Sequence, residues 1–488
     1  MTKRTDQRPA TVPFGATPAG QPPSVTEWAN RVVWTDRMLD ALRTGVRGDK
    51  WHTLHDKVFS SENLFSASQS VLGNRGASGV DHQTVEQFWD HILEEVRRLE
   101  EELRTGKYQP HAVKRVMIPK PGSTEKRPLG IPSVRDRVVQ TALLHVLEPI
   151  FDVTFAENSY GLRKGRGCHH ALERIEALLN EGYVYVVDAD LKSYFDTIPK
   201  ERLLDRVRER VSDSGVLRLV QRFLEQGVMD GLSEWTPEKG TPQGAVISPL
   251  LANLYLNPLD HLLAEAGIAM IRYADDFVIL CRSRVDAEQA LAKVKQWVED
   301  NGLTLHPTKT KIVDARTEGF DFLGYTFRGD LRLPRKKSLD KVKDSLRAKT
   351  SRSHGHSLQR TVQTLNATLH GWFGFFRHCN GTVFRSLDGW LRGRLRSILR
   401  KRAGRRGRGR GTDHQRWPNG YFADLGLYSL QGAHGRLQQS LAGPSRDNHQ
   451  LVSRMREIRP SGLEGGGTHL NGFSLPLSYL TLQSPKAP

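Results

Sequence analysis

Two adjacent carboxylates interrupt an apolar stretch in the second half of the chain. The stretch is Ile271-Arg272-Tyr273-Ala274-Asp275-Asp276-Phe277-Val278-Ile279-Leu280. Apolar and aromatic residues on both sides of a short polar pair predict two antiparallel strands joined by a tight turn. One interpretation is a solvated turn, because aspartate is an ordinary turn residue. The other is a metal site, which requires a further carboxylate at the same turn.

A third aspartate ends another segment that we predict to be a strand. The run Tyr183-Val184-Tyr185-Val186-Val187-Asp188-Ala189-Asp190 is rich in β-branched and aromatic residues, as strands are. Such a strand could bring Asp190 beside Asp275 and Asp276. Mg²⁺ prefers oxygen ligands, and two such ions bridged by carboxylates clamp the attacking and leaving oxygens of a phosphoryl transfer. The three aspartates are therefore predicted to be catalytic and to hold two Mg²⁺ ions.

A Gly- and Pro-rich turn lies between these aspartates in the sequence. It comprises Gly240-Thr241-Pro242-Gln243-Gly244 and continues into the apolar segment 245–253. Such a turn can present backbone amides, and the side chain of Gln243, to a nucleotide. Taken in this order, the three stretches resemble the palm of a reverse transcriptase. Their residues are similar to those of the group II intron-encoded reverse transcriptase/maturase family. The resemblance covers about residues 76–435.

The resemblance implies an α+β fold arranged as a right-hand polymerase, with fingers, an α/β palm and an α-helical thumb, or maturase (X), region. Residues 113–132 alternate in polarity and break at Pro121-Gly122, which predicts a basic hairpin. In the family this hairpin belongs to the fingers. Lys126 and Arg127 are therefore implied to contact the triphosphate, and the alternative is a solvated basic hairpin.

Phe195 lies five residues beyond Asp190. The resemblance implies that its ring lies under the sugar of the incoming nucleotide, where it would clash with a ribose 2′-hydroxyl and favour deoxynucleotides. The alternative is a core position, because aromatic side chains bury large apolar areas. Asp196, the next acid along the chain, is not expected to bind metal.

The region after the palm is helical in pattern and strongly basic. Aromatic residues alternate with cations over residues 339–399, and a dense arginine cluster occupies residues 392–410. Residues 404–411 are too rich in glycine for a helix and predict a flexible linker that binds phosphates. The residues expected to bind RNA are Arg400, Arg402, Arg405 and Arg406.

The composition indicates a polyanionic partner. The 488 residues include 72 Lys and Arg against 54 Asp and Glu, a formal net charge of +18, and nucleic acid is the usual partner of such a chain. No long uninterrupted apolar run is present, so no membrane partner is expected. The three cysteines are far apart, so neither a disulfide framework nor a paired-cysteine zinc site is available. The start has no apolar signal core, which favours the cytoplasm.

These features predict a chain of several regions. In order, they are a disordered lead at 1–23, an N-terminal extension at 24–83, reverse transcriptase fingers and palm at 84–334, a helical thumb with a basic linker at 335–411, and a maturase element with a disordered tail at 412–488.

The function implied by the resemblance is that of an RNA-directed DNA polymerase encoded by a group II intron. Its partners would be dNTPs, an intron RNA template and a DNA target or primer, and it would assist intron splicing as a maturase. Two alternatives stay open: an RNA-binding maturase that only assists splicing, and a domesticated or defence-associated reverse transcriptase without a resident intron. Many family members carry a zinc-supported endonuclease built on paired cysteines, which this sequence lacks, so nicking of target DNA is not expected. The oligomeric state is unknown from sequence.

Overall fold

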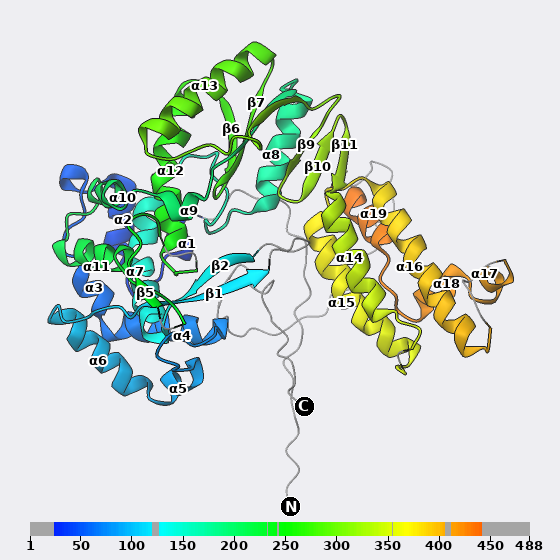
Figure 1. Cartoon of the computed structure of the whole chain (residues 1–488), viewed down its shortest axis with the longest axis horizontal. Helices are drawn as coiled ribbons and strands as arrows, with labels where there is room; N and C mark the ends of the chain where they lie inside the picture. Colours follow the sequence, from blue (N-terminus) through cyan, green and yellow to red (C-terminus); the bar gives the residue numbers. More distant parts are fainter. Residues whose placement is uncertain are drawn as a thin grey trace, which may run out of the picture. The chain divides into compact units, whose positions relative to one another are not determined.

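The computed structural model describes residues 24–119, 126–231, 233–241, 244–353, 355–405 and 411–441. The chain divides into two compact units between Phe320 and Asp321, and Figure 1 shows their elements in sequence colours. The expected lead at 1–23 and residues 442–488 of the expected tail lie outside the described residues.

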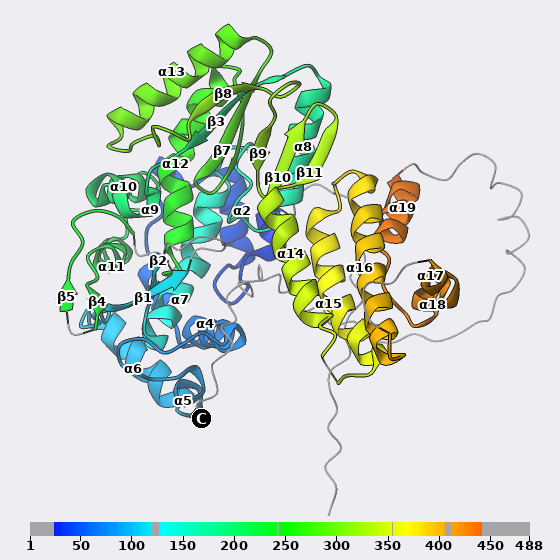
Figure 2. The same cartoon turned by 45° about the vertical axis from the view of Figure 1, so that its right-hand side comes forward.

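A four-stranded sheet in the first unit carries the aspartate turn. Its strand order is β6-β7-β3-β8, and each neighbouring pair is antiparallel. The predicted hairpin and the predicted strand before Asp190 are both confirmed, and Figure 2 shows them side by side. The strands span Ala269–Tyr273 (β6), Asp276–Cys281 (β7), Tyr185–Asp190 (β3) and Lys311–Asp314 (β8).

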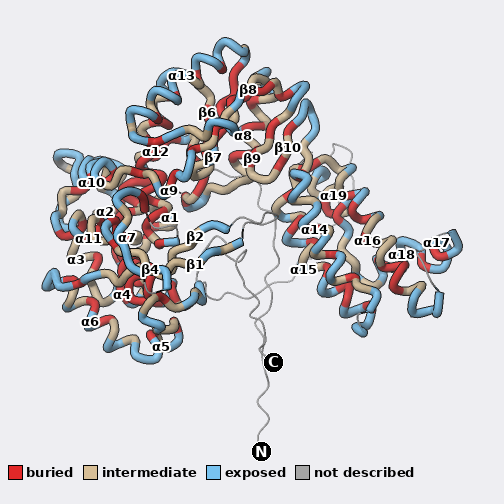
Figure 3. Tube along the Cα trace, viewed as in Figure 1, coloured by how far each residue is buried: buried red, intermediate tan, exposed pale blue. Residues whose placement is uncertain are grey.

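Helices with apolar faces pack against this sheet. Helices α8, α12 and α13 contact its strands, and α7 packs against α12. Most residues of α7 and α12 are buried, whereas α13 buries one face and exposes the other, as Figure 3 shows. That difference follows from sequence, because only α13 alternates small apolar residues with charged ones at helical spacing. The helices span Val134–Asp152 (α7), Cys168–Asn180 (α8), Ser248–Glu265 (α12) and Arg284–Asp300 (α13).

The fingers contain a second sheet with the order β2-β1-β4-β5. Strands β1 (Val113–Pro119) and β2 (Lys126–Ile131) are antiparallel, which confirms the predicted basic hairpin; its connection, residues 120–125, lies outside the described residues. Strand β4 (Val228–Asp230) pairs in parallel with β1 and antiparallel with β5 (Ser233–Trp235). This second hairpin was not predicted from the sequence, because each of its strands has only three residues.

The N-terminal segment is built into the first unit. Fully buried Trp34 donates from its indole nitrogen to the backbone carbonyl of His145 in α7, at 2.9 Å. The remaining elements of this unit are α1 (Val25–Trp28), α2 (Asp36–Thr44), η1 (Arg47–Asp49), α3 (His55–Phe59), α4 (Ser61–Asn74), α5 (Val85–Asp90), α6 (Ile92–Arg104), α9 (Tyr194–Thr197), α10 (Lys200–Arg208) and α11 (Ser214–Leu224).

The second unit combines a small sheet with a helical domain. The sheet has the order β11-β10-β9, and the helices pack around aromatic side chains such as Trp372 and Phe376, whose ring centroids are 4.9 Å apart. Among the described residues, no helix is long and apolar enough to cross a membrane. The elements are β9 (Phe320–Phe322), β10 (Tyr325–Arg328), β11 (Leu331–Pro334), α14 (Lys336–Lys349), α15 (Leu358–Phe376), α16 (Gly381–Arg402), α17 (Thr412–Arg416), α18 (Asn419–Asp424) and α19 (Leu430–Leu441).

Candidate active site

The register of the palm sheet gathers the three predicted catalytic aspartates at one end. Asp190, the last residue of β3, lies directly opposite Asp276, the first residue of β7. Asp275 is in the two-residue turn that joins β6 to β7, where Tyr273 pairs with Asp276. Directly opposite residues in a sheet have neighbouring side chains. Residues 85 positions apart in sequence are thereby placed at one turn.

The turn itself is tight and closely covered. Ala274 has φ +59, a left-handed conformation that L-residues seldom adopt and that two-residue hairpin turns require. Gly161 lies against this turn so closely that a Cβ added there would overlap the backbone nitrogen of Ala274. The amide of Asn253 in α12 donates to the carbonyl of Gly161 at 2.9 Å. Only glycine at position 161 lets this loop lie on the turn.

A buried arginine in β6 holds the turn in place through hydrogen bonds. The Arg272 and Asp260 side chains are both fully buried and form an ion pair, with the Arg272 Nε donating to an Asp260 oxygen at 2.8 Å. The guanidinium also donates to the carbonyl of Ala274 at 2.9 Å and to the hydroxyl of Ser159 at 2.7 Å. A further bond reaches the Asn253 side-chain oxygen at 2.8 Å. One side chain therefore ties β6, α12, the covering loop and the aspartate turn together.

The electrostatics of the aspartates favour a bound cation. Burial raises the pKa of the Asp275 carboxyl most, a backbone hydrogen bond lowers it, and the negative charge of Asp190 raises it further, whereas Arg272 and Lys309 oppose the shift. The Lys309 ammonium donates to Asp190 at 2.6 Å. Lys309 is exposed and Asp190 is half-buried, so this pair contributes little to stability. Lys309 nevertheless places a positive charge where the aspartates repel one another.

The carboxylate oxygens of the three aspartates are suitable ligands for hard divalent cations. In the described part of the chain, however, their side chains are not already arranged around a cation position. No group of three or more His, Cys, Asp or Glu side chains among them converges as a ready-made metal cluster. Asp190, Asp275 and Asp276 offer carboxylate oxygens alone, which suits Mg²⁺. A carboxyl whose pKa is raised partly by a neighbouring carboxylate would also gain from a cation.

The predicted nucleotide contacts lie on segments that touch one another. The backbone nitrogens of Gly240 and Thr241 donate to the carbonyls of Ile198 and Phe195, at 2.8 and 2.7 Å. Phe195 is half-buried and packs at the edge of the core, with its ring centroid 5.5 Å from that of Tyr194. This position is compatible with both interpretations of Phe195.

The other side of the same turn touches the fingers. A Cβ at Gly244 would overlap the carbonyl oxygen of Gly130 in β2. Lys126 and Arg127 are exposed at the start of that strand. Gln243, the fourth predicted nucleotide contact, lies outside the described residues. The predicted roles of these four residues stay predictions.

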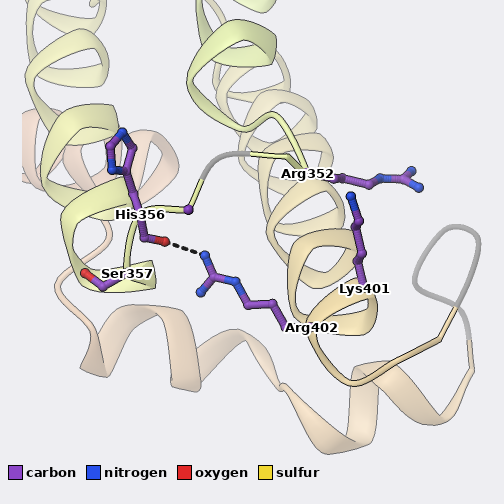
Figure 4. A pocket seen from close by; sticks show the side chains of 6 residues that line it. Arg352, His356, Ser357, Lys401 and Arg402 are labelled. Atoms are coloured by element: carbon purple, nitrogen blue, oxygen red, sulfur yellow. Dashed lines mark hydrogen bonds between the residues drawn. The ribbon is translucent and has the colours of Figure 1, made fainter.

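The arginines predicted to bind RNA differ in their surroundings. Arg400 donates to the buried Asp413 at 2.5 Å and so helps to hold α17 on α16. Arg402 donates to the backbone carbonyl of His356 and lines a hollow of about 510 Å³ with Arg352 and Lys401, shown in Figure 4.

Two members of this predicted set remain. Arg405 is exposed beyond the end of α16, and Arg406 lies outside the described residues. Arg402 and Arg405 are thus placed on or near the surface for RNA contact, which stays a prediction for the whole set, whereas Arg400 has an internal role as well.

Sequence reasoning missed the residues that position the aspartates. Arg272, Asp260, Asn253 and Gly161 make the contacts described above, and none was predicted. The available signal was a charged residue between Ile271 and Tyr273, in a strand that is otherwise apolar. Burial of that charge requires a partner, but the sequence does not say which acid supplies it.

Comparison with known proteins gives the family. Residues 118–327 match the model of reverse transcriptase (RNA-dependent DNA polymerase), and residues 339–417 match that of the group II intron maturase-specific domain. The chain is 35% identical over 323 residues to "Protein YkfC" of Escherichia coli (strain K12), covering 58% of this chain and 82% of that protein. The chain belongs to the group II intron reverse transcriptase/maturase family. The predicted right-hand polymerase fold is confirmed by this membership.

Other similarities are more partial. The chain is 34% identical over 214 residues to the group II intron-encoded protein LtrA of Lactococcus lactis subsp. cremoris, covering 43% of this chain and only 35% of LtrA. Among solved structures, "Partial Cas6-RT-Cas1--Cas2 complex" is similar at 25% identity and a TM-score of 0.34, over 51% of this chain and 43% of that one. The fold assignment rests on the family match and the palm sheet, not on this structural similarity.

Replacing Arg272 by Met should cost about 3–5 kcal/mol of folding free energy, because Asp260 would stay buried without its partner. Replacing Asp260 by Leu as well should recover much of that loss. Primer extension should not recover, since neither replacement restores the bonds to Ala274 and Ser159. Urea unfolding and primer extension on the two single variants and the double variant measure both effects. Recovery of extension along with stability would assign the pair to packing alone.

Asp275→Asn should raise the melting temperature of the metal-free protein at pH 7.5. A carboxyl whose pKa is higher in the folded chain contributes stability below its unfolded pKa, and that contribution is lost as pH rises through its folded pKa. Asparagine cannot ionise, so the variant avoids this loss, and the difference should vanish under acid conditions. Thermal melts in EDTA across pH test this, with exposed Asp90→Asn as control. An offset that does not change with pH would contradict it.

Proposed function

We propose that this protein copies RNA into DNA by two-metal phosphoryl transfer at Asp190, Asp275 and Asp276. The observation that supports this most directly is the register of the palm sheet, which sets Asp190 opposite Asp276 beside the Asp275 turn. These residues lie within the part of the chain that matches the reverse transcriptase domain. An intron RNA template, a DNA primer and dNTPs are the proposed partners.

The chain's own contribution to the reaction is positioning and charge, which suffices for phosphoryl transfer. Two Mg²⁺ ions, when bound, would activate the primer 3′-oxygen and neutralise the developing charge on pyrophosphate. The three aspartates would hold these ions, and the bond from Arg272 to the carbonyl of Ala274 fixes the turn that carries Asp275. Lys309, largely exposed and already beside Asp190, can hold a proton near the leaving phosphate.

Nucleotide selection would fall to the fingers and to the segment after β3. Lys126 and Arg127 are cations on the strand that contacts Gly244, so they suit the triphosphate. Gln243 directly precedes Gly244 in the sequence. The half-buried ring of Phe195, anchored to Thr241 through its backbone, would exclude the ribose 2′-hydroxyl.

A second proposed activity is assistance to intron splicing. It is supported by the match of residues 339–417 to the maturase-specific domain and by the cations on the surface of that unit, among them Arg352, Lys401 and Arg402. Such a role needs RNA binding but not the aspartates. The two activities should therefore be separable by mutation.

Asn in place of Asp190, Asp275 or Asp276 should reduce cDNA synthesis by about 100-fold or more, because each removes a metal ligand worth several kcal/mol in the transition state. RNA affinity and the yield of spliced intron RNA at low Mg²⁺ should stay near wild type. Primer extension, filter binding and a splicing assay measure the three effects. Asp196→Asn, a nearby exposed acid, is the matched control. Undiminished extension by the three variants would refute the metal assignment.

Phe195→Ala should lower the preference for dNTPs over rNTPs by about tenfold or more, since the ring would no longer occupy the space of the 2′-hydroxyl. Phe195→Tyr keeps a ring and should keep most of the preference. Single-nucleotide incorporation with each nucleotide gives the ratio of kcat/KM values. An unchanged ratio in a destabilised Ala variant would make Phe195 a core residue only.

A further inference from the structure

The outer edge of the fingers sheet exposes an aromatic ring that the proposed catalytic residues do not use. Trp235 is the last residue of β5, and 40% of its surface is exposed. A single exposed apolar side chain is common on soluble proteins, so the neighbours of this ring decide whether it indicates a partner. Figure 2 shows β4 and β5 at one edge of this sheet, with β2 at the other.

A guanidinium already covers part of this ring. The Arg115 side chain in β1 lies over Trp235, with its guanidinium carbon 5.5 Å from the ring centroid. Asp230 lies beside Arg115, with a carboxylate oxygen 3.4 Å from a terminal nitrogen of the guanidinium. The strand register puts both residues on one face, because Trp235 pairs with Val228 and Val228 with Val113, two residues before Arg115.

The same face offers a second exposed apolar side chain. Met117 is two residues beyond Arg115 in β1 and is 41% exposed. The charges of the sheet are unequal, since its four strands hold the cations Lys114, Arg115, Lys126 and Arg127 against the anions Asp230 and Glu234. An aromatic ring with a stacked arginine in a net positive sheet suits unpaired nucleic acid, where bases stack on the ring and cations contact phosphates.

The chain and the sheet both connect this ring to residues predicted to contact the nucleotide. From Trp235 the chain runs five residues to Gly240, whose nitrogen donates to the carbonyl of Ile198, and then to Thr241, which donates to that of Phe195. Lys126 and Arg127 lie on β2, three strands from β5. Strands in a sheet are about 4.7 Å apart, so the two edges are separated by roughly 14 Å. The register adds an offset of six residues along the strands, because Trp235 aligns with Val113 through Val228 whereas Lys126 pairs with Pro119, which is roughly 20 Å at about 3.3 Å per residue. Trp235 and Lys126 are therefore roughly 24 Å apart, the length of about seven stacked nucleotides at roughly 3.4 Å each.

We propose that Trp235, with Arg115, forms a stacking platform for one unpaired base of the template strand, about seven nucleotides ahead of the base being copied. The proposal rests on the proposed polymerase function, which supplies the single-stranded template. Trp235 would then be a positioning residue, which touches the template but not the reacting atoms. Its effect should appear in template affinity at one template position.

The test combines protein variants with single abasic sites. Primer–template duplexes with a 5′ RNA overhang would carry one abasic nucleotide at each overhang position in turn, and affinity would be measured by fluorescence anisotropy. Wild type should lose about fivefold or more affinity when the abasic site is near position seven, since about fivefold is the low end of the range for removing one stacked base. Trp235→Ala should bind the intact overhang correspondingly less tightly and should be insensitive to that abasic site.

Two further variants separate stacking from other causes. Trp235→Phe keeps an aromatic face and should retain most of the position-specific effect, while Leu93→Ala removes an exposed apolar residue from α6 and should behave as wild type. Equal sensitivity of wild type and Trp235→Ala at every overhang position would overturn the proposal.

The binding profile is independent of catalysis, so the two proposals can fail separately. Primer extension by the wild-type protein on the intact duplex reports the polymerase function alone. If the protein extends the primer but no abasic position lowers the affinity, the stacking role of Trp235 is refuted while the polymerase function is supported.

Discussion

The palm of this protein depends on one buried charge. Burying an ion pair removes two charges from water, and the attraction offsets that cost only when every remaining donor is satisfied. Arg272 meets this condition, since its guanidinium donates to Asp260, Asn253, Ser159 and the carbonyl of Ala274. A lysine could not replace it, because a point charge lacks the planar fork that reaches a helix, a loop and a turn at once.

The constraint matters because the groups it positions repel one another. Burial and the charge of Asp190 both disfavour ionised Asp275, and the turn that carries it holds Ala274 in the left-handed region. Local strain of this kind persists where the surrounding structure fixes the backbone. Here α12 and the loop at Gly161 supply that fixation. The arrangement is unfavourable without a cation and is, for the same reason, suited to binding one.

Sequence patterns predicted the parts of this site that are local. The hairpin around Asp275, the strand ending at Asp190 and the basic fingers hairpin follow from apolar alternation over a few residues, and the structure contains all three. The partners of Arg272 did not follow, because Ser159 and Asp260 lie 113 and 12 residues away and nothing in their neighbourhood marks them. Gly161 is likewise one of several glycines in a basic loop, and only its contact with the turn distinguishes it from the others.

The net charge of the chain predicts the class of its partner better than it predicts which residues contact that partner. An excess of cations predicts a polyanion, yet several arginines of this chain are used inside the fold. Arg163 donates to Asp152 at 2.7 Å, and Arg396 to the carbonyl of Trp417 at 2.9 Å. Both are buried, and Arg400 pairs with buried Asp413. Surface cations that lie beside an exposed aromatic ring, as Arg115 does, are therefore better candidates for nucleic-acid contact than the densest arginine run in the sequence.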